Sequence, residues 1–170
     1  MTLSDIASIV EIIGILAVVF GLWMGLMQLR MHRKQQRDMA IMECARSFED
    51  HEFTEAYGLI TDLKDGISYS ELKALGKDHE EAALRIGMKF ETIGLLVFKG
   101  VVPIDAMHDL VGDAALTVWR ILENYAHESR TERSHPTFWE WYQWLVDRLK
   151  ERSSSKPQPA FINHRNWKEK

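Results

Sequence analysis

An apolar stretch from Ile6 to Leu29 is the feature that most constrains how this chain can fold. Its core, residues 12–29, contains Gln28 as its one strongly polar residue. At about 1.5 Å per helical residue, this core is roughly 27 Å long, close to the thickness of about 30 Å of a bilayer's hydrocarbon layer. The alternative is the core helix of a soluble protein, for which shorter apolar runs are typical. We therefore predict a transmembrane anchor over residues 1–29.

Basic residues follow the apolar stretch directly. We call them the basic collar: Arg30, Arg33, Lys34 and Arg37. A cleaved secretory signal would carry its basic residues before the apolar run, where this chain has Asp5 and Glu11 instead. By the positive-inside rule, the collar predicts an uncleaved single-pass anchor with its N-terminus outside and residues 30–170 in the cytoplasm. In a bacterial host this would be the inner (cytoplasmic) membrane, and the collar would lie on the membrane surface beside anionic lipid headgroups.

One face of the predicted span carries small and polar residues, spaced alternately by four and three positions. This face, the seam, consists of Ala7, Glu11, Gly14, Val18, Gly21, Gly25 and Gln28. Small residues in a heptad pattern let a second helix approach closely in a membrane. The seam therefore predicts a helix-packing interface, either with a second copy of the chain or with another protein. The alternative explanation is that glycine is simply common in transmembrane helices.

Glu11 is an ionisable residue in this stretch, and such residues often mark functional sites inside membranes. At the helical rise, however, Glu11 lies about 28 Å from Arg30, which places it at the opposite membrane boundary. We therefore predict an interfacial carboxylate, with an intramembrane functional role as the alternative. Gln28, near the other boundary, is interpreted as an interfacial or inter-helix hydrogen-bonding residue.

The rest of the chain has the composition of an ordinary globular domain. The whole sequence is 46% hydrophobic and 27% charged, with a formal net charge of −4. Residues 30–152 can form one hydrophobic core but are too few for two domains, and residues 153–170 are interpreted as a basic flexible tail. The single cysteine, Cys44, excludes an intrachain disulfide and a cysteine-rich zinc site. We expect it to pack between helices, with palmitoylation as the alternative.

Periodicity and capping residues predict helices throughout this domain and no convincing strand. Residues 31–48 should continue the anchor as one rod, because no Gly or Pro interrupts them. The other expected helices cover residues 52–63, 70–76, 78–99, 103–111, 113–128 and 137–152. The fold class is therefore all-α: a single N-terminal transmembrane helix that continues into a cytoplasmic helical bundle.

The helix expected at 78–99 is apolar almost all the way round and should be central to the bundle. Gly87 and Gly94 would allow a neighbouring element to pack tightly against it. Glu91 shares a stripe with apolar residues that include Leu95 and Phe98, so we predict a buried carboxylate. Such a group must be paired or protonated. A bond to Arg120 or to a backbone amide is expected, with a catalytic acid of raised pKa as the alternative.

Aromatic residues are concentrated near the C-terminal end of the domain, at Phe138, Trp139, Trp141, Tyr142 and Trp144. They cannot all face the core of one helix. Trp141 and Trp144 can share the core side, and Trp139 and Tyr142 would then contact a partner or the membrane. The tail, which is rich in Lys and Arg, adds Phe161 and Trp167 as possible partner contacts. A solvated, disordered tail is the alternative.

Candidate residues for chemistry are few. Asp105, His108 and Asp109 share a helical face and could present metal ligands, but acidic residues near helix starts are also ordinary caps. The tripeptides at residues 50–52 and 78–80 are similarly unspecific. No phosphate-binding loop, zinc-protease motif or nucleophile elbow is present. We expect no catalytic residues, no cofactor, no bound metal and no nucleic-acid partner.

One long motif resembles a known family. It consists of Phe90-Glu91-Thr92-Ile93-Gly94-Leu95-Leu96-Val97-Phe98-Lys99-Gly100-Val101-Val102-Pro103-Ile104-Asp105, then Trp119, Phe138-Trp139-Glu140-Trp141 and Trp144-Leu145. The motif resembles a family of small bacterial proteins known only as a domain of unknown function. The resemblance implies one N-terminal transmembrane helix and an all-helical cytoplasmic domain over roughly residues 5–150, and it implies no catalytic residues.

Together these features predict a membrane-anchored helical interaction protein. It would act by self-assembly or as an accessory subunit of a larger membrane complex, with the lipid bilayer and a protein contacted through the span as its partners. The alternative hypothesis is a membrane-tethered cytoplasmic effector enzyme of a bacterial stress or antiphage system. Glu91, His108 and Asp109 would be the residues to test for that activity.

Overall fold

The computed structural model describes the backbone of residues 3–152 and 160–168, and the side chains of residues 14–152, 160–162 and 164–168. These residues form helices and no strand. The helices are α1 (Leu3–Phe48), α2 (His51–Thr61), α3 (Tyr69–Ala74), α4 (Lys77–Phe98), α5 (Ile104–Glu132), α6 (Glu140–Arg152) and α7 (Ala160–Asn163). The predicted all-α fold is confirmed. The chain divides into two compact units, residues 1–40 and 41–170.

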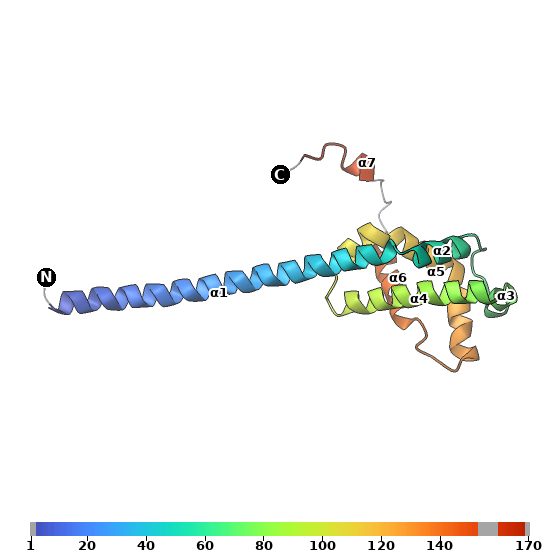
Figure 1. Cartoon of the computed structure of the whole chain (residues 1–170), viewed down its shortest axis with the longest axis horizontal. Helices are drawn as coiled ribbons and strands as arrows, with labels where there is room; N and C mark the ends of the chain where they lie inside the picture. Colours follow the sequence, from blue (N-terminus) through green and yellow to red (C-terminus); the bar gives the residue numbers. More distant parts are fainter. Residues whose placement is uncertain (1–2, 153–159, 169–170) are drawn as a thin grey trace. The chain divides into compact units, whose positions relative to one another are not determined.

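Helix α1 supplies the first unit and extends into the second (Figure 1). It runs without interruption to Phe48, as the absence of Gly and Pro after the span predicted. Among the described residues, one helix near the N-terminus, from Gly14 to Phe48, is long and apolar enough to cross a membrane. No part of its most apolar window is buried within the chain.

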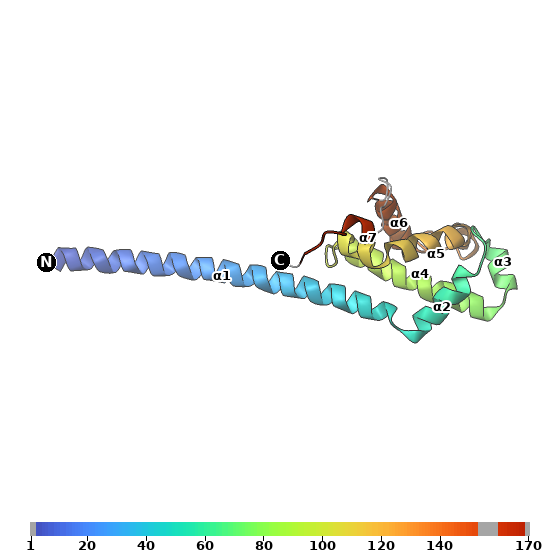
Figure 2. The same ribbon diagram turned by 90° about the horizontal axis from the view of Figure 1, so that it is seen from above.

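Helix α4 is the central element of the second unit, as predicted. It packs mainly on α6 and α2 and also contacts α3 and α5 (Figures 1 and 2). The core is rich in aromatic residues, with Tyr142 at its centre. Its ring lies 4.8 Å from that of Phe90 and 5.0 Å from that of Trp119, between ring centroids. Its hydroxyl donates a hydrogen bond of 2.8 Å to the carbonyl of Ala115, so this buried polar group is satisfied.

The two glycines of α4 permit close contact with α6 and the turn before it, where the sequence predicted a close neighbour without identifying it. A Cβ atom placed on Gly94 would lie 2.1 Å from the carbonyl oxygen of Trp141. A Cβ on Gly87 would meet the ring of Trp139. Because neither distance leaves room for a methyl group, both positions require glycine for this packing.

Helix α5 corrects one predicted boundary. We expected one helix ending at Val111 and another starting at Asp113, but a single helix runs through both. Gly112 does not break it, because its apolar face continues on both sides at helical spacing. The buried residues of this face include Met107, Val111, Ala115, Val118 and Leu122. Asp113 is exposed on the helix surface and is not a cap.

Helix α6 begins three residues later than predicted, at Glu140 instead of Thr137. Residues 136–139 form a turn, in which Trp139 has a φ of 53°. This left-handed conformation is rare for a bulky side chain and cannot continue a right-handed helix. Helix α3 was expected over residues 70–76, but it begins at Tyr69 with Ser68 as its N-cap and ends at Ala74. The Ser68 hydroxyl accepts from the amide of Glu71, and the Glu71 carboxylate accepts in return from the amide of Ser68.

Candidate functional site

The seam on α1 is open along its described part. A Cβ placed on Gly14, Gly21 or Gly25 would meet no atom within 4 Å outside the local helix. Shallow depressions lie in the helix surface beside Gly14 and Gly25. Such depressions can receive the ridges of a second helix. Ala7 and Glu11 belong to the predicted seam, but their side chains lie outside the described ones.

Large apolar side chains cover the rest of the span and are likewise exposed. They include Ile15, Leu16, Val19, Phe20, Leu22, Trp23, Leu26 and Leu29. In water, contiguous apolar exposure of this extent would be strongly unfavourable, whereas a bilayer solvates it. The residues of the basic collar, Arg30, Arg33, Lys34 and Arg37, follow on the same helix and are exposed.

The aromatic cluster near α6 has a different orientation from the predicted one. Trp139 is 2% exposed and Tyr142 is fully buried, so the prediction that these two residues contact a partner is wrong. The left-handed backbone at Trp139 turns its side chain onto Gly87. The expected helix from Thr137 divided the two faces correctly but assigned the core to the wrong one.

Trp141 and Trp144, which the sequence had assigned to the core, are half-buried at the surface. Together with Phe98 of α4 they form a cluster that we call the outer aromatic face. The Phe98 ring lies 4.6 Å from that of Trp141 and 5.6 Å from that of Trp144, between centroids. Phe98 is 51% exposed, and Leu95, Val101 and Met88 extend the apolar surface along and beyond α4. The apolar stripe of α4 named in the sequence analysis is thus its more exposed side.

Phe161 and Trp167, the other two possible partner contacts, are exposed. Their exposed fractions are 77% and 72%. Both side chains are therefore accessible, and their contact with a partner stays a prediction.

Glu91 is half-buried, and its carboxylate caps the start of α6. One oxygen accepts a hydrogen bond of 2.8 Å from the amide of Tyr142. Burial raises the pKa of Glu91, and the backbone amides of Tyr142 and Trp141 oppose that rise. The predicted bond to a backbone amide is confirmed, whereas Arg120 instead lies 3.4 Å from a carboxylate oxygen of Asp65. The geometry is that of an N-terminal helix cap.

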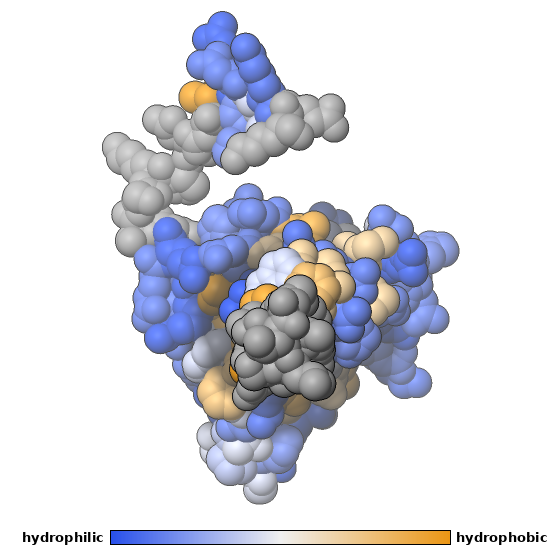
Figure 3. Space-filling view, turned by 90° about the vertical axis from the view of Figure 1, so that its left-hand side faces the viewer, coloured by the Kyte–Doolittle hydropathy of each residue, from blue (hydrophilic) through white to orange (hydrophobic). Residues whose placement is uncertain are grey.

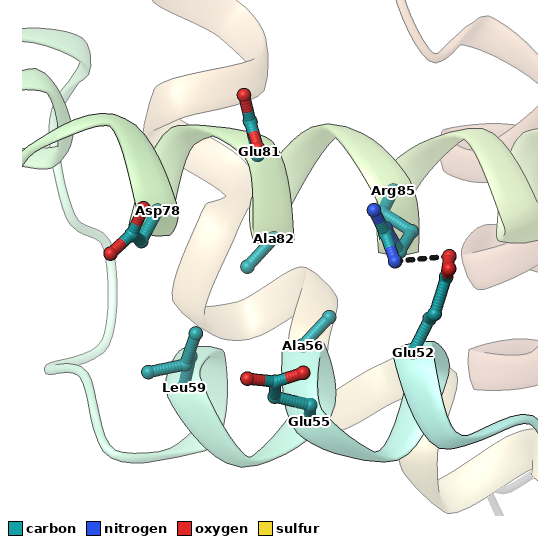
Figure 4. A pocket seen from close by; sticks show the side chains of 8 residues that line it. All are labelled: Glu52, Glu55, Ala56, Leu59, Asp78, Glu81, Ala82 and Arg85. Atoms are coloured by element: carbon teal, nitrogen blue, oxygen red, sulfur yellow. Dashed lines mark hydrogen bonds and ion pairs between the residues drawn. The ribbon is translucent and has the colours of Figure 1, made fainter.

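A small groove of about 160 Å³ lies between α2 and α4. Its lining residues are Glu52, Glu55, Ala56, Leu59, Asp78, Glu81, Ala82 and Arg85. Figure 4 shows Leu59 and Ala82 pointing toward one another across the groove, while Glu81 points away from α2. Arg85 forms an ion pair with Glu52 at one end. The carboxylates do not converge on a common point, so the groove presents an apolar floor with a charged rim.

The residues considered as metal ligands are engaged separately. Asp105 pairs with Arg152, and Nδ1 of His108 lies 3.2 Å from Asp109. Asp50, from the first acidic tripeptide, accepts from the amide of Glu52 as the N-cap of α2. In the part of the chain that the structure describes, no group of three or more His, Cys, Asp or Glu side chains is arranged to hold a metal ion.

Cys44 is buried, and burial raises the pKa of its thiol. This burial agrees with the expected role in helix packing, and the helices that Cys44 contacts stay a prediction. A buried thiol with a raised pKa is protonated and poorly nucleophilic at neutral pH.

The chain was compared with protein families, curated proteins and solved structures. No curated protein and no solved structure matches it. One family profile matches residues 11–149, which include most of the apolar part of α1 and the helices up to α6. The long motif from Phe90 to Asp105 lies within this match, in agreement with the resemblance seen in the sequence. The chain therefore belongs to the family described as a domain of unknown function, DUF4760.

Proposed function

We propose that this protein is a single-pass membrane-anchored interaction protein that acts through assembly of its transmembrane helix. The observation that carries the proposal is the open seam on α1, where a Cβ atom on any of the three glycines would have no described atom outside the local helix within 4 Å. A lipid-exposed helix gains little from apolar contact alone, because lipid tails are as apolar as its side chains. Close backbone approach at small residues provides the packing energy instead.

The proposal includes an orientation. The basic collar follows the span, so the N-terminus lies outside and residues 30–170 lie in the cytoplasm. In a bacterial cell the membrane would be the inner one. Each collar residue near the surface of an anionic leaflet contributes about 1 kcal/mol to this arrangement.

The partner that the seam fits best is a second copy of the same helix. A heptad pattern of small residues is complementary to itself, because each glycine depression can receive a side chain from the facing helix. An accessory role beside a different membrane protein uses the same surface. The two forms of the proposal differ in the mass of the assembly.

Native mass spectrometry of the tagged full-length protein, gently extracted from its own membrane, tests the proposal. Masses at two or more times that of one tagged chain, which is 19.7 kDa plus the tag, would establish self-assembly. Additional defined proteins in the complex would establish an accessory subunit. A bare monomer under conditions that keep lipids bound would contradict both forms.

A pair of variants assigns the interface. Gly21→Leu with Gly25→Leu fills the seam and should abolish the assembly. Val19→Leu with Met27→Leu introduces the same residue at two positions on other faces of the helix, where both side chains are exposed, and should leave the assembly unchanged. Equal assembly of the two variants would reject the seam as the interface.

A further inference from the structure

The outer aromatic face is an unusual surface for the exterior of a small helical domain. Phe98, Trp141 and Trp144 contact one another edge to face or tilted, with Phe98 half-exposed. Exposed Met88, Leu95 and Val101 lengthen it along α4 and just beyond its end. In the view of Figure 3, hydrophobic residues lie among hydrophilic ones on the visible face. Trp141 and Trp144 are half-buried, and partly exposed aromatic residues that cluster with exposed apolar ones mark contact surfaces in proteins.

The rim of this face on α6 is acidic. Glu140 and Asp147 are exposed, and they flank Trp144 at helical spacings of four and three residues. Half-buried Glu91 lies under the start of the same helix. Lys99 is a cation on this side, with its ammonium 5.7 Å from the Phe98 ring centroid, and Arg148 is paired with Glu151 at 2.6 Å. The rim therefore favours a ligand that is both apolar and cationic.

A segment with those properties exists in the same chain. Residues 160–168 expose Phe161, Ile162 and Trp167, whose exposed fractions are 77%, 50% and 72%. The segment also carries Arg165 and Lys168 and contains no Asp or Glu. Its helix, α7, has four residues. A helix this short is not stable in water without tertiary packing, so it gains from a docking surface.

The connection between the two elements is long enough. Residues 153–159 separate α7 from the end of α6, and a chain of this length spans at most about 25 Å. Trp144 precedes the end of α6 by about 12 Å along the helix axis. The segment can therefore reach the outer aromatic face of its own chain, where a short tether keeps its effective concentration in the millimolar range.

We propose that residues 160–168 dock on the outer aromatic face of the same chain, with Phe161 and Trp167 against Phe98, Trp141 and Trp144. Arg165 and Lys168 then lie beside Glu140 and Asp147. The docked segment covers the domain's exposed aromatic surface and controls access to it. This contact is independent of the seam, because it uses residues of the second unit alone.

Photo-crosslinking of the full-length protein in nanodiscs tests the proposal. A benzophenone amino acid replaces Phe161, which keeps an aromatic side chain at that position. Crosslinked peptides are identified by mass spectrometry, in a mixture of isotope-labelled and unlabelled chains. We expect crosslinks within one chain to residues 95–101 and 141–147.

Charge variants make the test specific. Glu140→Lys with Asp147→Lys should lower the crosslink yield about threefold, because the change replaces two weak, solvent-exposed attractions with repulsion. Adding Arg165→Glu with Lys168→Glu should restore the yield. The matched control is Asp113→Lys, an exposed site on α5, which should have no effect.

The other outcomes reject the proposal. Crosslinks to these residues only between labelled and unlabelled chains would assign the face to a second copy. Crosslinks to lipid would assign the segment to the membrane. An unchanged yield in the Glu140→Lys and Asp147→Lys variant, with the fold intact by circular dichroism, would reject this face as the docking site.

Discussion

The indole ring of Trp139 occupies the space that a side chain at Gly87 would need. A Cβ atom on Gly87 would lie 1.9 Å from Cζ2 of that ring. Trp139 is held there by its left-handed backbone, with a φ of 53°, and is 2% exposed. The strained turn before α6 and the glycine of α4 therefore form one packing unit, in which each depends on the other.

Gly87→Ala should destabilise the domain. The added methyl group must displace a buried ring that has no free volume beside it, and overpacking of this kind costs about 1–3 kcal/mol. The measurement is the free energy of unfolding of the full-length protein in detergent, from urea titrations followed by near-ultraviolet circular dichroism. That signal reports the packing of the tryptophan rings.

Gly58→Ala is the matched control. Gly58 lies within α2, is exposed, and has no atom within 4 Å of a placed Cβ. Alanine should therefore stabilise the protein by about 0.5–1 kcal/mol, because it restricts the unfolded chain and favours helix. Destabilisation by Gly87→Ala together with stabilisation by Gly58→Ala would support the packing of Trp139 on Gly87. Stabilisation at both positions would mean that Trp139 does not lie over Gly87.

The sequence predicted the helices whose limits are set by local chemistry. The bounds of α4 follow from an acidic first turn and from Gly100, whose φ is 70°. The need for small residues at Gly87 and Gly94 was also predictable, because two glycines one heptad apart on an apolar helix indicate a close neighbour. Which side chain fills the space was not predictable, since Trp139 lies far away in sequence.

The orientation of α6 shows where local reasoning fails. Pro136 and Thr137 are typical of a helix start, and nothing in the residues themselves indicates a left-handed Trp139. That conformation persists because burial of the ring on α4 offsets its cost. Helical spacing separated Trp141 and Trp144 from Tyr142 correctly, but which of the two faces packs on the core depends on contacts with α4 and α5 that lie far away in sequence.

Glu91→Gln should change how stability depends on pH. Burial raises the pKa of Glu91 above its usual value of 4.5. The folded protein therefore holds a proton that the unfolded chain has lost, and stability falls as the pH rises through the window between 4.5 and the raised pKa. Glutamine keeps an oxygen acceptor for the Tyr142 amide without a charge. The free energy of unfolding of the variant minus that of wild type should therefore be larger at pH 7 than below pH 4.5.

The measurement is the free energy of unfolding at intervals between pH 3 and pH 8 for both proteins. A constant difference across this range would mean that Glu91 does not titrate with a raised pKa. If the variant instead loses stability relative to wild type as the pH rises, the backbone amides stabilise the charged form of Glu91 more than burial destabilises it.

Glu71→Gln provides a prediction of opposite sign. Hydrogen bonds from Lys64 and Ser68 lower the pKa of Glu71 to about 2. The carboxylate therefore stabilises the folded state above its unfolded pKa, and this contribution is lost as the pH falls from 4.5 toward 2. The variant should be less stable than wild type at pH 7, and the two should converge near pH 2. Convergence at neutral pH instead would show that the capping box at Ser68 does not depend on the charge.

Lys89→Met tests how the end of α1 is held in the domain. The Lys89 ammonium donates to the carbonyl of Ser47, one of the last four carbonyls of α1, which have no partner within the helix. It also lies 5.4 Å from the ring centroid of Phe48 and 4.9 Å from that of Phe53. Methionine keeps much of the apolar stem but removes both interactions, so we expect a loss of about 1–2 kcal/mol.

The informative readout for Lys89→Met is local. Amide hydrogen exchange of residues 44–48 should become faster relative to the core amides of α4, because the last turn of α1 loses its cap. Lys150→Met, at an exposed position of α6, is the control and should leave this exchange unchanged. Global destabilisation without faster exchange at residues 44–48 would contradict the capping role, since it would place the cost of the substitution in the packing of α4 and not at the end of α1.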